Sequence, residues 1–241
     1  MMSIKITSPK VILFDCFETI VENDLNGWKS LFAEIIKKNH WDLDPLEFWN
    51  LWKKYEVNFR EIRTNMEKIE ESPPFITYEK AWKDCFDIVF RELNIDGNSK
   101  LCAELCINNM AKNKPYSDSA EMLNKLSQNH KIGVISNADN NFLYPVLDKL
   151  NINFDFTMSS EEAECYKPNP NIFKKFIYKN NLNPKDCWYV GDKEFDDVTG
   201  SSSLGMQPVL INRSVYNDLR YLDKYIQISD LRQLYEIIKS L

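Results

Sequence analysis

The chain has 241 residues, of which 44% are hydrophobic, and it carries a formal net charge of −6. This length accommodates one large domain, or a core with a smaller second domain, and the scattered basic residues argue against a nucleic-acid or anionic-membrane surface. No apolar run reaches the ~18 residues of a membrane-spanning helix, and the N-terminal stretch lacks the long apolar segment of a signal peptide. We therefore expect a soluble, cytoplasmic protein that is a monomer or a homodimer.

Apolar runs of strand length recur along most of the chain. Each is nearly continuous, which is typical of strands that are buried on both faces of a sheet. They occupy residues 11–15, 132–136, 154–159, 187–192 and 208–212. Between them lie amphipathic stretches at 117–128, 140–150 and 170–180, the last two with a proline near the start. Strands that alternate with helices predict a mostly parallel sheet built from βαβ units.

Residues 22–114 break this alternation. They contain no convincing strand, and large or charged residues recur in them at helical spacing. The helical stretches are 46–65, 78–93 and 100–112. We predict an α/β fold: a Rossmann-like three-layer core with a mostly parallel sheet, formed by 1–21 and 115–241, plus an inserted all-helical cap domain at 22–114. The tryptophans of the cap are expected to form its core, with one or two lining a substrate pocket: Trp41, Trp49, Trp52 and Trp82.

Neither the cysteines nor the histidines predict a reactive site. The six cysteines form no CxxC pair, and their spacing favours neither a disulfide framework nor a zinc site. Cys102 and Cys106 are expected to be thiols in a helix core. His40 and His130 each lie in a polar stretch near a predicted helix end, which indicates surface residues. Carboxylates are therefore the expected catalytic groups.

Polar residues follow the predicted strands at the points where those strands end. In an open α/β sheet, ligands bind at the carboxyl ends of the strands, so we expect these residues to converge on one rim. They are Asp15 after the first strand, Ser136 and Asn137 at the second, Lys167 after the third, and Asp192, Asp196 and Asp197 after the fourth. Such a set is able to attack, clamp and supply metal ligands for a small anionic substrate.

Four segments that contain these residues resemble, in order, the motifs of the haloacid dehalogenase (HAD) superfamily. The segments are FDCFETI (14–20) for the nucleophile loop, VISN (134–137) for the second motif, YKPNPNIF (166–173) for the lysine motif, and VGDKEFDDVTGSSSLGM (190–206) for the acidic fourth motif. Each motif alone is a weak signal, but the ordered set at strand ends is strong. The resemblance covers the core, and it implies a helical (C1-type) cap after the first motif.

The resemblance implies a role for each motif residue. Asp15 is expected to be the nucleophile, forming an aspartyl intermediate that water then cleaves. Ser136 is expected to hydrogen-bond a phosphoryl oxygen or a substrate carboxylate, with Asn137 beside it. Lys167 is expected to neutralise charge on the nucleophile and the substrate, because lysine binds phosphate as a point charge.

The same resemblance implies a Mg²⁺ site. Asp15, Asp192 and the backbone carbonyl of Phe17 are the expected ligands, and hard oxygen atoms of this kind suit Mg²⁺. Asp197 is expected to support the metal shell or to orient the catalytic lysine. Asp196 competes for that role, because spacings of four and five residues both occur in the family.

Phe17 departs from the phosphatase pattern of the superfamily, which has an aspartate two residues after the nucleophile as general acid and base. The 2-haloacid dehalogenases have an aromatic residue at this position, since halide leaves without a proton. Phe17 is therefore expected to contact the substrate, and it favours dehalogenation. Glu18 replaces the glycine common in this loop and is a weaker candidate for the missing acid.

Asp192 favours the opposite conclusion. Dehalogenases need no metal and have a small hydroxyl residue at this position, and the acidic residues near Asp192 would repel one another without a cation. The segment LWKKYEVNFREIR (51–63) resembles the cap helix on which dehalogenases place a carboxylate-binding arginine. Arg63, with Arg60 second, is therefore expected to bind an anionic group of the substrate.

Three functions remain open on the sequence. The first, which we favour, is a Mg²⁺-dependent, phosphatase-like hydrolase of a small phosphorylated metabolite with Asp15 as nucleophile. The second is a metal-independent 2-haloacid dehalogenase, with a phosphonate hydrolase as a minor variant that would need a cap lysine. The third is a binding module that keeps the fold and has lost turnover.

Overall fold

Five β-strands of the computed structural model, which describes residues 6–241, lie where the apolar runs predict them. They are the first five of the seven strands of the described residues: β1 (Val11–Phe14), β2 (Lys131–Ser136), β3 (Phe156–Ser159), β4 (Cys187–Gly191), β5 (Gln207–Ile211), β6 (Arg220–Tyr221) and β7 (Ile226–Ile228). One sheet contains them in the order β3-β2-β1-β4-β5-β7-β6, and only β6 runs antiparallel to its neighbour. The mostly parallel sheet is confirmed. β6 and β7 are not predicted, because such short strands carry too little pattern to distinguish them from a loop.

The helices of the core are α5 (Ser119–Ser127), α6 (Asn140–Asp148), α7 (Ser160–Ala163), α8 (Pro170–Lys179), α9 (Gly200–Ser202) and α10 (Leu231–Lys239). α5 precedes β2, and the other helices of the core follow strands, as βαβ units require. A 3₁₀ turn at Pro184–Asp186 precedes β4, and a π-helical turn at Glu194–Thr199 follows it. Pro170 begins α8 as predicted, but Pro145 lies inside α6 rather than near its start, which corrects that expectation.

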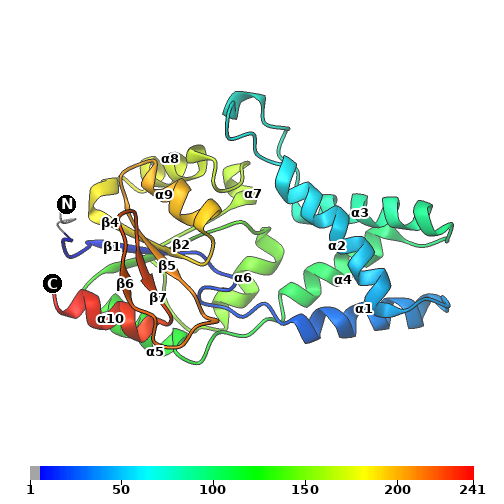
Figure 1. Cartoon of the computed structure of the whole chain (residues 1–241), viewed down its shortest axis with the longest axis horizontal. Helices are drawn as coiled ribbons and strands as arrows, with labels where there is room; N and C mark the ends of the chain where they lie inside the picture. Colours follow the sequence, from blue (N-terminus) through cyan, green and yellow to red (C-terminus); the bar gives the residue numbers. More distant parts are fainter. Residues whose placement is uncertain (1–5) are drawn as a thin grey trace.

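Alternate residues of each strand point to opposite faces of the sheet. Both faces are apolar here, and helices pack on each of them. In β1, Ile12 and Phe14 pack in one buried cluster with α5 and α10, whereas Val11 and Leu13 pack in a second cluster with α8. Figure 1 shows the sheet between α8 and α9 on one side and α5 and α10 on the other. The predicted three-layer α/β core is therefore confirmed.

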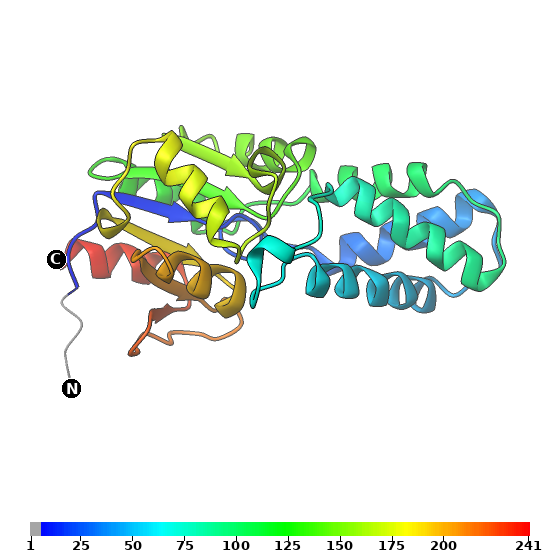
Figure 2. The same ribbon diagram turned by 90° about the horizontal axis from the view of Figure 1, so that it is seen from above.

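Four helices between β1 and α5 lie beyond the carboxyl ends of the strands, on the side to which the strand arrows point (Figures 1 and 2). They are α1 (Leu25–Asn39), α2 (Pro45–Ile62), α3 (Tyr78–Leu93) and α4 (Ser99–Met110), with a 3₁₀ turn at Ile69–Glu71. α1 is absent from the three predicted helical stretches. Trp52 and Trp82 are buried among these helices, whereas Trp41 and Trp49 are half-buried. Within residues 6–241, no helix combines the length and apolar character needed to cross a membrane.

The two chain segments that join this helical bundle to the sheet are hydrogen-bonded to each other. The backbone N–H of Glu22 donates to the carbonyl of Lys114 at 2.8 Å. Asp139, which precedes α6, accepts the N–H groups of Tyr78 and Glu79 at 2.8 Å each and so holds the first turn of α3 against the core. The contact between Glu22 and Lys114 lies at the predicted junctions, while the division into a core and a separate cap domain stays a prediction.

Candidate active site

Asp15 lies directly after β1, at the edge where the parallel strands end. Its backbone N–H donates to the carbonyl of Val190 at 2.8 Å, which continues the pairing with β4. Its Oδ1 accepts two hydrogen bonds, from Ser136 Oγ at 3.0 Å and from Lys167 Nζ at 2.7 Å. Among the described residues, none donates to Oδ2, so this oxygen is available to attack an electrophile.

Lys167 is the buried cation of the site, with 2% of its side chain exposed. Its ammonium group donates to Asp15 Oδ1 at 2.7 Å, to Asp197 Oδ1 at 2.6 Å and to Tyr189 OH at 2.8 Å. Burial alone would lower the pKa of Lys167, but the two carboxylates outweigh it and raise that pKa. The ammonium therefore stays charged, and its three N–H groups meet three acceptors in fixed positions.

Tyr189 is a residue of the site that the sequence analysis missed. It lies fully buried within β4, and its hydroxyl accepts from Lys167 and donates to the carbonyl of Ile135 at 2.7 Å. In the sequence it is one residue of a run that is hydrophobic throughout. The available signal was its phenolic oxygen, which needs a partner when it is buried.

Tyr189→Phe is expected to lower the free energy of unfolding by about 1–3 kcal/mol, because it leaves a buried Lys167 N–H without its acceptor and removes the hydrogen bond to the Ile135 carbonyl. Chemical denaturation measures this change. Tyr178→Phe is the matched control, since Tyr178 on α8 is 90% exposed and its hydroxyl should contribute nothing. Equal stability of the two variants would contradict this account of how Lys167 is supported.

Asp197 reaches Lys167 from the π-helical turn after β4. Its second oxygen accepts the backbone N–H of Lys193 at 2.9 Å. The close approach is possible because β4 ends in Gly191, where a Cβ would overlap the Asp197 carboxylate. Both oxygens of Asp197 are thus engaged, which suits the expected role of orienting the lysine, while its expected metal role stays a prediction.

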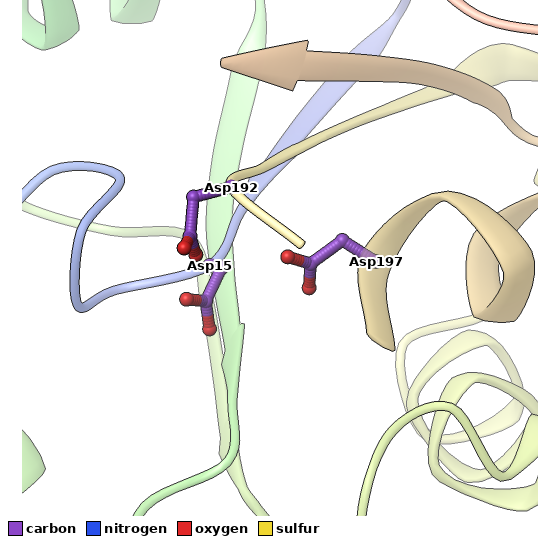
Figure 3. Close-up of side chains that lie close together, drawn as sticks. All are labelled: Asp15, Asp192 and Asp197. Carbon is purple, nitrogen blue, oxygen red and sulfur yellow. The ribbon is translucent and has the colours of Figure 1, made fainter. Parts of the chain in front are cut away.

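Three carboxylates, of Asp15, Asp192 and Asp197, offer oxygen atoms that all lie within 4.8 Å of one another. Figure 3 shows these groups gathered beside the ends of the strands. Burial and the neighbouring Asp15 raise the pKa of Asp192 to about 6, and burial raises that of Asp197 to about 7 although Lys167 opposes it. Lys193 lies 2.6 Å from Asp192, yet two lysines do not balance three carboxylates. An anionic, all-oxygen donor set of this kind fits Mg²⁺.

The affinity for Mg²⁺ is expected to be constant at high pH and to fall on acidification through the pKa of Asp192 (about 6). Protons compete with the cation for this carboxylate, so it contributes up to about a tenfold loss in affinity per pH unit below its pKa. Calorimetric Mg²⁺ titrations between about pH 5 and about pH 8 measure this dependence. An affinity that rises on acidification would contradict the assignment of Asp192 as a ligand.

Asn137 holds the backbone of Lys167. Its Oδ1 accepts the Lys167 N–H at 2.8 Å, and its Nδ2 donates to the Lys167 carbonyl at 3.1 Å. The amide therefore fixes the segment that carries the lysine, and the expected contact with substrate stays a prediction. Nδ2 also lies 3.4 Å from Asp196 Oδ2. Asp196 lies in the wall of the adjoining cavity, whereas Asp197 lies in the carboxylate cluster.

Arg63 and Arg60 lie in the wall of the cavity between the cap helices and the strand ends. Arg63 follows α2, and its guanidinium lies 4.3 Å from the ring centre of Tyr166. It also donates to Tyr78 OH at 2.6 Å and lies 3.4 Å from Asp196 Oδ2. The structure thus places both predicted arginines at the cavity, while their contact with a substrate stays a prediction.

Phe17 and Glu18 follow Asp15 and line the same cavity. The ring of Phe17 packs against Phe142, with centroids 5.6 Å apart, so an apolar contact occupies the position at which the phosphatase pattern has its acid. Glu18 has a φ of 62°, in the left-handed region that favours glycine, and its Oε1 accepts the N–H of Asn23 at 3.1 Å. The carboxylate is therefore tied to its own loop, which argues against Glu18 as a substitute acid.

The described histidines and cysteines do not line the cavity. His40 is the C-terminal cap of α1, and His130 Nδ1 lies 2.8 Å from the carbonyl of Pro9. Cys102 and Cys106 are buried free thiols of α4, as expected for helix-core residues. The chemistry of the site therefore depends on carboxylates and cations.

A family model described as haloacid dehalogenase-like hydrolase matches residues 12–211. The chain belongs to this family. It is therefore a HAD hydrolase, and the family membership and hydrolase class predicted from the four motifs are confirmed.

Three relatives indicate the range of activities in this family. A glyceraldehyde 3-phosphate phosphatase of Pyrococcus furiosus is 25% identical over 244 aligned residues, which cover 95% of this chain and 93% of the relative. The solved HAD-hydrolase YfnB of Bacillus subtilis, bound to magnesium, has a TM-score of 0.77 at 16% identity and covers 97% of this chain and 100% of its own. The defluorinating L-2-haloacid dehalogenase Rha0230 has a TM-score of 0.74 at 21% identity and covers 96% and 95%. The two solved structures are 16% and 21% identical to this chain, so their similarity establishes the shared fold alone.

Proposed function

We propose that this HAD hydrolase is a Mg²⁺-dependent phosphatase of a small phosphorylated metabolite, with Asp15 as its nucleophile. The observation that carries the proposal is the crowding of the Asp192 carboxylate against Asp15, in a cluster whose negative charge two lysines do not balance. A metal-independent dehalogenase does not need a carboxylate cluster with excess negative charge. The phosphatase from Pyrococcus furiosus makes glyceraldehyde 3-phosphate the first substrate to test.

In the proposed reaction, Asp15 Oδ2 attacks the phosphorus atom while Ser136 and Lys167 hold Oδ1. A bond forms between Oδ2 and phosphorus, and the bond between phosphorus and the ester oxygen breaks. Water then attacks the phosphorus of the aspartyl phosphate, which releases phosphate and restores the carboxylate. Lys167, held by Asp15 and Asp197, keeps a positive charge beside the nucleophile in both steps. Phosphoryl transfer depends mainly on such positioning and charge neutralisation.

Neither step has a protein acid or base at the position of Phe17. The leaving alkoxide takes its proton from solvent in the cavity, and the attacking water gives its proton to solvent. General acid–base catalysis typically contributes about 10²–10⁴ in rate, so we expect slow turnover. The aspartyl phosphate is then expected to persist long enough for detection by mass spectrometry.

Asp15, Asp192 and the backbone carbonyl of Phe17 are the residues that would hold Mg²⁺, which supplies charge neutralisation for the phosphoryl oxygens when bound. Asp197 is assigned to the orientation of Lys167, because both of its oxygens are already engaged. Asn137 is assigned to the same task through the backbone of that lysine.

Phosphate release from a panel of phosphomonoesters, with Mg²⁺ and after EDTA treatment, tests the proposal. We expect phosphatase activity with Mg²⁺ and no activity after EDTA treatment. The activity should return when the metal is restored. Asp192→Asn keeps the shape of the side chain and removes its charge, so it should require a higher Mg²⁺ concentration than the wild type. Phosphatase activity that survives EDTA would overturn the metal-dependent proposal.

A second candidate function is 2-haloacid dehalogenation, which the apolar contact between Phe17 and Phe142 favours because halide leaves without a proton. Halide release from a panel of 2-halocarboxylates measures it. Release that EDTA leaves unchanged and Asp15→Asn abolishes would replace the phosphatase proposal. An aspartyl phosphate that forms and never turns over would instead identify a binding module.

A further inference from the structure

The segment that follows Asp15 is a tight loop of residues 16–22, which we call the 16–22 loop. Its own backbone closes it, since the N–H of Val21 donates to the carbonyl of Cys16 at 2.9 Å. Within the turn, Glu18 has a φ of 62°, which is unfavourable for a residue with a side chain. Such a conformation persists only where the surrounding contacts hold it. The 16–22 loop therefore depends on other segments of the chain for its position.

Arg213, two residues after β5, holds this loop from the core. Its Nε and Nη2 both donate to the carbonyl of Thr19, at 3.0 Å and 2.6 Å. The side chain of Arg213 is 13% exposed, and its guanidinium lies 4.0 Å from the ring centre of Tyr116. Thr19 is fully buried, and its hydroxyl has no partner among the described residues. Side-chain hydrogen bonds therefore hold Thr19 through its carbonyl and not through its hydroxyl.

The guanidinium of Arg213 is itself fixed from behind. Its Nη1 donates to Asp118 Oδ1 at 2.9 Å. Asp118 is 2% exposed, and its Oδ2 accepts the N–H of Leu231, the first residue of α10, at 2.8 Å. Each of the three guanidinium nitrogens thus has an acceptor, and the planar group cannot move without losing one of these hydrogen bonds. The place of the Thr19 carbonyl is therefore set relative to β5 and α10.

Phe17 lies two residues before Thr19 in the 16–22 loop. Its backbone carbonyl is the one assigned to Mg²⁺ in the proposed function, and no N–H of the described residues donates to it. This oxygen is therefore available to a ligand. Mg²⁺ demands near-ideal octahedral geometry, so a protein oxygen that binds it must be held in place. A displacement of Thr19 would move this carbonyl.

We infer that Arg213 is a positioning residue of the active site, which sets the place of the Phe17 carbonyl by holding the carbonyl of Thr19. The inference rests on the proposed function, in which the Phe17 carbonyl is a ligand of Mg²⁺. Arg213 is not among the residues that line the cavity, so it acts through the 16–22 loop and not by contact with substrate or metal. Residues that orient metal ligands in this way typically contribute about 10–100-fold to metal affinity.

Two measurements on the full chain carrying Arg213→Met test the inference. Calorimetric titration with Mg²⁺ is expected to show about ten- to a hundredfold weaker binding than the wild type. Amide hydrogen exchange of the metal-free protein, followed by mass spectrometry of its peptides, is expected to be about tenfold faster or more in the 16–22 loop, because three hydrogen bonds that hold it are lost. A peptide from β2 should keep its exchange rate.

Two further variants complete the experiment. Arg213→Lys keeps a positive charge beside Asp118 but lacks the fork that grips the Thr19 carbonyl. It should fold like the wild type and lose about threefold or more in Mg²⁺ affinity, so it decides the question if Arg213→Met does not fold. Arg220→Met is the matched control, because Arg220 of β6 is 60% exposed and pairs with Asp218. This control should keep both the affinity and the exchange rates.

Unchanged Mg²⁺ affinity in the folded variants of Arg213 would overturn the inference, and so would unchanged exchange of the 16–22 loop. Both results would leave the proposed function intact, and a loss of stability alone would indicate a purely structural role. A wild type that binds no Mg²⁺ would contradict the proposed function instead. Faster exchange of the loop in Arg213→Met would then still uphold the positioning role of Arg213.

Discussion

Asp15→Asn is expected to lower kcat for phosphate release by about 10⁴-fold or more, because it removes the carboxylate that forms the covalent intermediate. Asparagine keeps an oxygen that accepts from Ser136 and Lys167, so the hydrogen bonds around position 15 can persist. The aspartyl phosphate should also disappear from the mass spectrum. Thermal unfolding of the variant checks that the loss is chemical and not a loss of fold.

Asp196→Asn is the matched control for this variant. Asp196 is an acidic residue of the same region, but it lies in the cavity wall, 3.4 Å from Arg63, outside the carboxylate cluster. We expect it to lose less than about tenfold in kcat. A folded Asp15→Asn variant that retains most of its phosphatase activity would show that another residue attacks the substrate.

Phe17→Asp is expected to raise phosphatase activity by about 10²–10⁴-fold in the presence of Mg²⁺, because it restores a general acid at the leaving group and a base for water. The gain should be absent after EDTA treatment, since the variant changes proton transfer and leaves the metal site in place. The substitution removes a half-buried ring from its contact with Phe142, and we expect it to lower the free energy of unfolding by about 1–3 kcal/mol. Phosphate release under saturating substrate measures the gain.

Phe17→Asn separates proton transfer from the loss of the ring. It has nearly the size and polarity of the aspartate variant and cannot act as a general acid, so its activity should stay near that of the wild type. An equal gain in both variants would attribute the effect to a wider cavity. No gain in Phe17→Asp would favour the dehalogenase or the binding module over the phosphatase.

The sheet and the positions of the motif residues could be predicted because both depend on short stretches of sequence. Each of the first five strands is a continuous apolar run, and such runs form strands that are buried on both faces. Parallel strands bring their carboxyl ends to one edge, so Asp15, Ser136 and Asp192 had to be neighbours once the runs were identified. The sequence analysis did not predict β6 and β7, which are too short to have a pattern. It also did not predict α1, whose residues we did not separate from the rest of the cap.

The tasks of individual side chains around Lys167 depend on contacts between distant segments. Asp196 and Asp197 are equivalent in sequence, but the π-helical turn and the missing side chain of Gly191 bring only Asp197 to the lysine. Tyr189 is hidden in an apolar strand, and its role becomes visible only when its hydroxyl is seen between Lys167 and a backbone carbonyl. No local pattern encodes these pairings.

The sequence by itself therefore determined the family and the α/β sheet, and it predicted Asp15 as the attacking carboxylate, because ordered motifs and apolar runs are local features. Only the tertiary structure decided which acidic residue orients Lys167, and it placed Arg63 against Asp196 while Arg60 and Lys53 share Glu56. The physical reason is that charge balance in a cavity is a sum over residues from separate elements. Spacing along the chain does not report that sum.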